Sequence, residues 1–143
     1  MLNRILVAVD GSEGSRKAVT FAQQLATPTG AHLSLLTVVE PPTVIPIVPF
    51  EGFYYGTFDP SPDNLAAAQK ALTDLATQLP KDQVKGRVEV GPAADTIVRI
   101  AKEEAVDLVV IGARGLSGAE RLLLGSVSDR VVHHCPCPVT VVK

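Results

Sequence analysis

The residues best suited to chemistry in this chain form the pattern G-x2-G-x9-G-S, which comprises Gly112, Gly115, Gly125 and Ser126. An apolar stretch typical of a strand precedes the pattern, and residues 126–134 can form a helix directly after it. Glycines leave backbone N–H groups unobstructed, and the N-terminal end of a helix carries a partial positive charge. The segment therefore has the properties of a loop that binds a phosphate group.

Two common phosphate-binding motifs do not match this segment. It contains no lysine and no G-x4-G-K-[ST] sequence, so it is not a P-loop. Gly112, Gly115 and Gly118 are spaced as G-x2-G-x2-G, and they follow the fourth expected strand, whereas the dinucleotide fingerprint follows the first. A simpler interpretation stays open, in which Ser126 caps the helix as part of an S-x-x-D sequence and Gly125 permits the bend.

Three charged residues that could contact a ligand have two interpretations each. Arg114 or Arg121 can supply positive charge to phosphates, with Arg114 favoured because it lies between the first two glycines, although a solvated arginine is the commoner case. Asp10 follows the first apolar stretch and can accept hydrogen bonds from a ligand hydroxyl or amino group. Asp10 can equally hold an Asx-turn over residues 10–12.

No set of residues indicates a catalytic or metal centre. No Ser–His–Asp or Cys–His arrangement and no acid/base pair of carboxylates is evident, so no catalytic residue is predicted. Residues 133–137 (HHCPC) have the types found in zinc sites but not the usual ligand spacing, and the histidines suit the negative end of a helix. A disulfide between Cys135 and Cys137 would be strained, which favours reduced thiols and a cytoplasmic location.

The elements that must position these residues alternate along the chain. Strands are expected at residues 5–9, 31–39, 84–90, 106–111 and 139–142. The first helix is expected to end at a stop formed by residues 27–30, and the second to begin at Ser61-Pro62-Asp63. The third helix is expected to begin after Gly91-Pro92, and the fourth to span residues 126–134. This order predicts a single α/β domain, residues 1–143, with a parallel sheet covered by helices on both faces.

Residues 40–60 interrupt this alternation with a segment rich in proline that holds five of the six aromatic residues. The sequence predicts a long irregular loop there. Its aromatic side chains either form a lid or partner surface or pack back onto the domain, and both interpretations stay open.

The overall composition limits the classes of partner that the protein is expected to bind. The chain has 143 residues, a net charge of −2 and a pI of about 5.9, so no basic surface for nucleic acid is expected. No apolar run approaches the length of a membrane span, and the apolar stretch near the N-terminus is too short for a signal peptide. These features indicate a globular protein that interacts with neither nucleic acid nor membrane.

With these motifs in place, residues 3–143 resemble the universal stress protein family, in its ATP-binding form. The resemblance is carried by the strand and turn at residues 5–12, by residues 35–39, by residues 107–112 with the glycine pattern, and by residues 125–128 and 137–139. It implies an adenine-nucleotide α-hydrolase-like fold with strand order 3-2-1-4-5. The point where that order reverses then lies between the first and fourth strands, where Asp10 and Gly112 emerge.

The resemblance also implies a binding site for ATP, with Mg²⁺ arriving on the phosphates. Asp10 is expected to contact the ribose or adenine side, the backbone of Val38 to read the adenine edge, and Ala8 and Val9 to wall the base pocket. The implied site residues are Ala8, Val9, Asp10, Val38, Gly112, Ala113, Arg114, Gly115, Gly125, Ser126, Val127 and Ser128.

The expected function is that of an ATP-binding, nucleotide-dependent switch or sensor in the stress response. Two alternatives stay open: a slow ATPase or phosphotransferase, and a dimeric adaptor whose nucleotide is structural. Val139–Val142 is apolar, β-branched and placed at a sheet edge, where unpaired backbone groups favour pairing. Because family members commonly dimerise through this strand, the resemblance implies a homodimer.

Overall fold

A computed structural model describes residues 1–41, 61–113 and 124–143 of the chain. The expected loop over residues 40–60 falls almost wholly outside the described residues. Arg114, Gly115 and Arg121 also lie outside them. Predictions about these positions therefore remain predictions.

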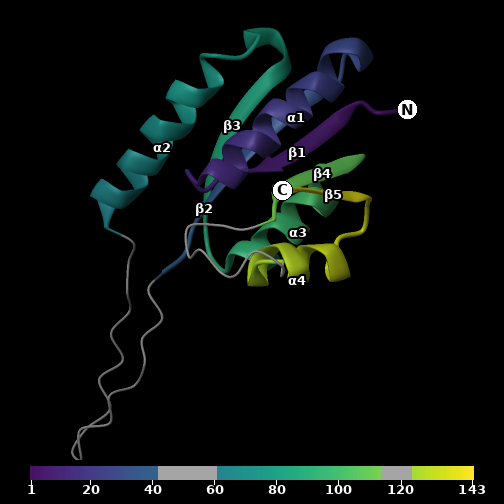
Figure 1. Cartoon of the computed structure of the whole chain (residues 1–143). Helices are drawn as coiled ribbons and strands as arrows, with labels where there is room; N and C mark the ends of the chain where they lie inside the picture. The colour runs from purple at the N-terminus through teal and green to yellow at the C-terminus, as the bar shows by residue number, and fades with distance from the viewer. Residues whose placement is uncertain (42–60, 114–123) are drawn as a thin grey trace, which may run out of the picture.

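Five strands form one sheet in the order β3-β2-β1-β4-β5, and every neighbouring pair is parallel (Figure 1). The strands are β1 (Arg4–Ala8), β2 (His32–Val39), β3 (Val84–Val90), β4 (Leu108–Gly112) and β5 (Val139–Val142). The predicted order 3-2-1-4-5 is confirmed. The central strand, β1, is rich in aliphatic residues because both of its faces are covered.

Within the described residues the strands are connected by the helices α1 (Glu13–Thr29), α2 (Pro62–Ala76), α3 (Ala93–Glu103) and α4 (Ser126–His134), with a short 3₁₀ turn, η1, at Lys81–Gln83. The predicted start of α2 is confirmed, since the side chain of Ser61 caps it and Pro62 is its first residue. Helix α1 continues through Pro28 and ends at Thr29, before Gly30 in the left-handed conformation (φ 71°).

The helices cover the sheet in two layers, one on each face. The first core lies between the sheet and α1 and α2, and its helical members are Ala18, Val19, Ala22, Ala26 and Leu72. The second core lies on the opposite face, and its helical members are Ala94, Ile97, Ile100, Ala101 and Val131 of α3 and α4. Figure 1 shows α3 and α4 side by side, away from α1 and α2. This division follows from right-handed crossovers running in opposite directions from β1.

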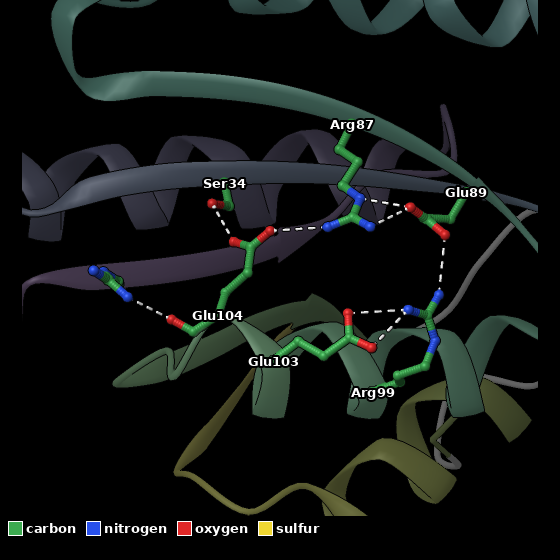
Figure 2. Close-up of polar contacts among 7 residues, drawn as sticks. Ser34, Arg87, Glu89, Arg99, Glu103 and Glu104 are labelled. Carbon is green, nitrogen blue, oxygen red and sulfur yellow. Dashed lines mark hydrogen bonds and ion pairs between the residues drawn. The ribbon is translucent and has the colours of Figure 1, made fainter.

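A chain of ion pairs joins the edge strand β3 to α3 (Figure 2). Glu89 binds both Arg87 and Arg99, and Arg99 also pairs with Glu103 at 3.0 Å. The Glu104 carboxylate pairs with Arg87 at 3.3 Å and accepts a hydrogen bond from the Ser34 hydroxyl at 3.0 Å. Because these side chains are partly exposed to solvent, each pair contributes little on its own, and together they tie the outer strand to the helix.

Candidate functional site

The candidate site lies at the carboxyl ends of β1 and β4, where the strand order reverses. From β1 the chain crosses by α1 to β2 on one side, while β4 flanks β1 on the other side. Open α/β sheets bind ligands at such a position. A pocket of about 360 Å³ opens there, lined by Ala8, Val9, Asp10, Ser12, Ser15, Leu36, Val38, Glu40, Ala93, Ile97, Ile111, Gly112, Gly125, Ser126, Val127 and Ser128.

The pocket therefore brings together most of the residues predicted from the sequence. Of those within the described residues, only Ala113 does not line it; Ala113 is buried beside it, and its carbonyl accepts a hydrogen bond from the Gly125 N–H. Seven further residues line the pocket that the predicted set omitted: Ser12, Ser15, Leu36, Glu40, Ala93, Ile97 and Ile111.

Asp10 holds the turn that leads from β1 into α1. Its Oδ1 accepts hydrogen bonds from the Ser12 N–H at 2.9 Å and from the Ser12 hydroxyl. The Ser12 Oγ in turn accepts from the Ser15 N–H at 3.1 Å and caps α1. Gly11 between them has φ 81°, a conformation that favours glycine. The Asx-turn interpretation is thus confirmed, and Asp10 lines the pocket at the same time.

Three helices begin around the pocket, and they differ in how their N-terminal N–H groups are satisfied. Ser12 caps α1. Glu40, at the end of β2, accepts the Ala93 N–H at 2.8 Å and so caps α3 from another part of the chain. No side chain in the described part of the protein caps α4. The first N–H groups of a helix need partners from outside the helix, and within the described residues a side chain satisfies one of them in α1 and one in α3 but none in α4.

Gly125 and Ser126 begin α4 in a way that contradicts the capping interpretation of the sequence. Gly125, not Ser126, occupies the cap position, and Ser126 is the first helical residue. Gly125 has an extended conformation (φ −61°, ψ 156°), and its carbonyl accepts the Asp129 N–H at 2.9 Å. Without a side chain at the cap position, the N-terminus of α4 faces the pocket directly.

Ser128 serves a structural role in this loop. Its buried hydroxyl donates to the carbonyl oxygen of Gly112 at 2.7 Å. This bond ties the first turn of α4 to the end of β4. The side chain of Ser128 therefore fixes the position of the helix N-terminus relative to the sheet.

Gly112 is required by packing as well as by its place in the pocket. A Cβ at this position would lie 2.7 Å from the carbonyl carbon of Gly14, 2.9 Å from its oxygen and 3.1 Å from the Ser15 nitrogen. The first turn of α1 thus lies against the end of β4 so closely that only glycine fits. The sequence pattern alone did not show this reason for the glycine.

Val38 presents its backbone to the pocket. β1 pairs with β2 only as far as Ala8 and Leu36, and the Val9 N–H donates to the Leu36 carbonyl. Backbone direction alternates along a strand, and Val39 directs its carbonyl to Gly91 on the β3 side. Val38 therefore directs its N–H and C=O, like Leu36, toward the space beyond the end of β1.

The charge of the pocket is negative within the described part of the chain. Asp10 and Glu40 line it, and no lysine or arginine there does. Among the described residues no group of three or more His, Cys, Asp or Glu side chains is placed to hold a metal ion. His133 and His134 each direct Nδ1 to a backbone carbonyl of their own helix at 2.8 Å, which agrees with a helix-terminal role.

Comparison with protein families and individual proteins gives a consistent result. The family model described as "Universal stress protein family" matches residues 1–143. The universal stress protein YxiE of Bacillus subtilis is 34% identical over 154 residues, and the match covers 100% of both chains. Among the residues the structure describes, none of the helices has the length and apolar character that crossing a membrane requires.

Solved structures agree with this fold. The universal stress protein UspA from Lactobacillus plantarum has a TM-score of 0.75 and 27% identity, covering 99% of this chain and 97% of the other. A universal stress protein crystallised in complex with cAMP has a TM-score of 0.68 and 27% identity, covering 99% and 96%. Both similarities extend over nearly the whole chain.

Proposed function

Because the chain belongs to the universal stress protein family, we propose that it binds ATP and acts as a nucleotide-dependent switch or sensor in the stress response. The observation that carries the proposal is the N-terminus of α4, which no described side chain caps and which opens into the pocket at the strand-order reversal. An uncapped helix N-terminus in a pocket suits an anionic group of a ligand.

The other side of the pocket suits a nucleobase. Its lining there is mainly aliphatic, with Ala8, Val9 and Leu36 among its members. The N–H and C=O of Val38 face the same space and offer one donor and one acceptor, which matches the alternating edge of adenine. Asp10 lies between the two parts of the pocket and is proposed to accept a hydrogen bond from the ribose.

The phosphates would then lie on the first turn of α4, on the backbone amides of Ser126, Val127 and Ser128. Arg114 is proposed to supply positive charge, since the described lining has none. Mg²⁺ is proposed to arrive with the nucleotide and to be held by phosphate oxygens and water, because the described side chains form no metal-binding cluster. The bound ion would neutralise part of the phosphate charge.

The comparison with a relative bound to cAMP supports an adenine nucleotide as the class of ligand. It leaves two candidates to separate by experiment, a nucleoside triphosphate and a cyclic monophosphate. The length of the glycine pattern between β4 and α4 favours ATP, because a longer loop can contact more phosphate oxygens than a cyclic monophosphate offers.

The geometry of the pocket favours a protein that binds ATP without hydrolysing it rapidly. Asp10 and Glu40 are the only carboxylates in the described lining, and both already accept hydrogen bonds from the protein. Neither is therefore well placed to activate water. A slow ATPase and an adaptor with a structural nucleotide remain the alternatives, and a homodimer through β5 is compatible with all three.

The test uses a substitution that removes one backbone donor and leaves the helix intact. Ser126 is the first helical residue, where proline is tolerated, as Pro62 at the same position of α2 illustrates. The extended conformation of Gly125 also suits a residue before proline. Ser126→Pro removes the N–H and the hydroxyl, whereas the matched control Ser126→Ala removes the hydroxyl alone.

Nucleotide released from the purified, denatured protein is identified by chromatography, and ATP and cAMP are then titrated calorimetrically into the three proteins. We expect ATP to bind the wild type and Ser126→Ala similarly, and Ser126→Pro about 10- to 100-fold more weakly, the effect of one lost hydrogen bond to a charged group. Absence of ATP binding by the wild type contradicts the proposal. Equal binding by Ser126→Pro would contradict the phosphate position, and tighter binding of cAMP would contradict ATP as the ligand.

A further inference from the structure

The turn between α4 and β5 contains both cysteines of the chain. Cys135 occupies the cap position directly after α4, and its N–H donates to the Val131 carbonyl at 2.9 Å. Pro138, directly after Cys137, accepts the Val109 N–H of β4 at 3.0 Å. Both ends of the turn are therefore anchored by backbone hydrogen bonds, which hold the two cysteines in a defined arrangement.

The two sulfur atoms are in direct contact. Their Sγ–Sγ distance is 3.5 Å, and both residues are free thiols and half-buried. A disulfide bond has a length of about 2.0 Å, so closure needs the sulfurs to approach by about 1.5 Å.

The surroundings of the pair distinguish the two thiols. Both pack against the core formed by the sheet with α3 and α4. Burial, followed by the hydrogen bond with Cys135, raises the pKa of the Cys137 thiol well above its ordinary value of 9.0. Cys137 therefore forms a thiolate less readily than an ordinary cysteine, and the first attack is assigned to Cys135.

We propose that Cys135 and Cys137 form a redox-active dithiol that reacts with low-molecular-weight disulfides and closes to a reversible intramolecular disulfide. The site lies at the opposite end of α4 from the pocket. It is independent of the nucleotide proposed above.

The reaction is a pair of thiol–disulfide exchanges. The Cys135 thiolate attacks one sulfur of the small disulfide, whose S–S bond breaks, and one small thiolate leaves. The Cys137 sulfur gives its proton to water and attacks the Cys135 sulfur of the mixed disulfide, and the second small thiolate leaves. The protein loses two electrons and two protons, and the small disulfide is reduced to two thiols.

The spacing of the cysteines favours reversibility over permanent closure. The bond would close a small ring that contains Pro136, whose fixed φ limits relaxation of the backbone. Strained disulfides are more easily reduced than structural ones and are the labile, exchangeable class. We therefore expect the pair to follow the ratio of small thiol to small disulfide around it.

The experiment equilibrates the full-length protein in glutathione buffers of graded redox ratio, quenches it with acid, alkylates it and measures the intact mass. We expect oxidised wild type to be lighter than the reduced protein by two hydrogen atoms, to resist alkylation at both cysteines, and to recover both thiols on addition of a dithiol reductant. Cys137→Ser should accumulate the mixed disulfide with glutathione at Cys135. Cys135→Ser should react more slowly, because burial raises the pKa of the remaining Cys137 thiol.

Three results would overturn the proposal: two alkylatable thiols in the wild type at every redox ratio, a wild-type mixed disulfide as abundant as in Cys137→Ser, or a disulfide between two chains. Circular dichroism establishes that each variant is folded. The wild-type mass measurement decides the proposal even where a serine variant does not fold.

Discussion

Two glycines of one sequence pattern have different physical roles. At Gly112 the first turn of α1 leaves no space for a Cβ, so the residue is required by packing. At Gly125 the backbone is extended (φ −61°), a conformation open to any residue, so no strain requires glycine there. What Gly125 provides is the absence of a capping side chain at the entrance to α4.

This difference leads to a prediction for Gly112→Ala. The added Cβ would lie 2.7 Å from a backbone carbon of Gly14, which cannot rotate away, so α1 has to shift from β4. Overpacking of this kind costs about 1–3 kcal/mol, which urea denaturation measures as a lower midpoint. Gly125→Ala is the control, with an expected cost of about 1 kcal/mol or less. Equal losses in the two variants would contradict this account of Gly112.

A second prediction concerns Asp107, whose carboxylate joins the starts of β4 and β1. Its Oδ2 accepts the N–H groups of Asn3 at 2.7 Å and Arg4 at 2.9 Å, and these bonds hold the pKa of Asp107 below its ordinary value of 3.8. A carboxyl group with a lowered folded-state pKa stabilises the fold above its unfolded-state pKa. That stability is lost as the pH falls through the folded-state value.

We therefore expect the wild type to lose stability in acid more steeply than Asp107→Asn, from about pH 4 downward. Urea denaturation at a series of pH values measures the two slopes. The exposed Asp82→Asn serves as the control and should keep the wild-type slope. An unchanged slope in Asp107→Asn would show that the two backbone bonds do not favour the ionised carboxylate.

Among the elements, the helix N-termini around the pocket determine where an anion can bind. Ser12 caps α1 from the adjacent residue, which an Asp-Gly-Ser sequence after a strand indicates. Glu40 caps α3 from 53 positions away, and no local pattern signals such a contact. This is why the predicted set includes the start of α4, which lines the pocket, but omits Glu40, which lines it as well.

The cap that Glu40 forms can be tested directly. Glu40→Ala leaves the Ala93 N–H without its acceptor and should destabilise the protein by about 0.5–2 kcal/mol. Glu40→Gln retains a carbonyl oxygen and loses only the charge, so we expect it to destabilise the protein by about 0.3–1 kcal/mol. Thermal unfolding followed by circular dichroism measures both. Equal stability of Glu40→Ala and the wild type would mean that water replaces the cap without cost.

The elements that the sequence predicted best are those whose signals are local. β3, α4 and β5 have the predicted bounds, because alternation, a preceding glycine and following prolines mark them. The C-terminal end of α1 shows the reverse case. Pro28 lies in its last turn, where the carbonyl of Gln24 loses one donor but the helix continues for one more residue. Residues 27–30 are exposed, so hydrogen bonds and not packing hold this last turn: the Thr29 hydroxyl donates to the Leu25 carbonyl at 2.7 Å, and the Gly30 N–H donates to the Ala26 carbonyl at 2.8 Å.

At the scale of the whole molecule, the alternating elements place the pocket and the two sheet edges in separate regions. The pocket lies at the centre of the sheet, where crossovers diverge from β1. β3 forms one edge, with the charged residues Lys85, Arg87 and Glu89, and edge charges discourage pairing with another chain. β5 forms the other edge and has no charged residue. The two edges therefore differ in their capacity to pair with a second copy.

Along β5 the backbone directions identify the groups available for pairing. The carbonyls of Pro138 and Val142 accept N–H groups from Val109 and Ala113, so the alternate residues of β5 face β4. Backbone direction alternates along a strand, so Val141 directs its N–H and C=O away from β4, toward the open edge of the sheet. A homodimer formed by pairing of β5 strands would use these outward groups.

Val141→Pro removes the outward N–H while leaving the hydrogen bonds to β4 in place, so we expect it to abolish the dimer. Val141→Thr, which keeps the N–H and the β-branched shape, is the matched control. Light scattering after size exclusion at micromolar concentration should return twice 15.1 kDa for the wild type and the threonine variant, and 15.1 kDa for the proline variant. A wild-type mass of 15.1 kDa would refute the dimer, and a dimeric, folded Val141→Pro would place the interface elsewhere on the molecule.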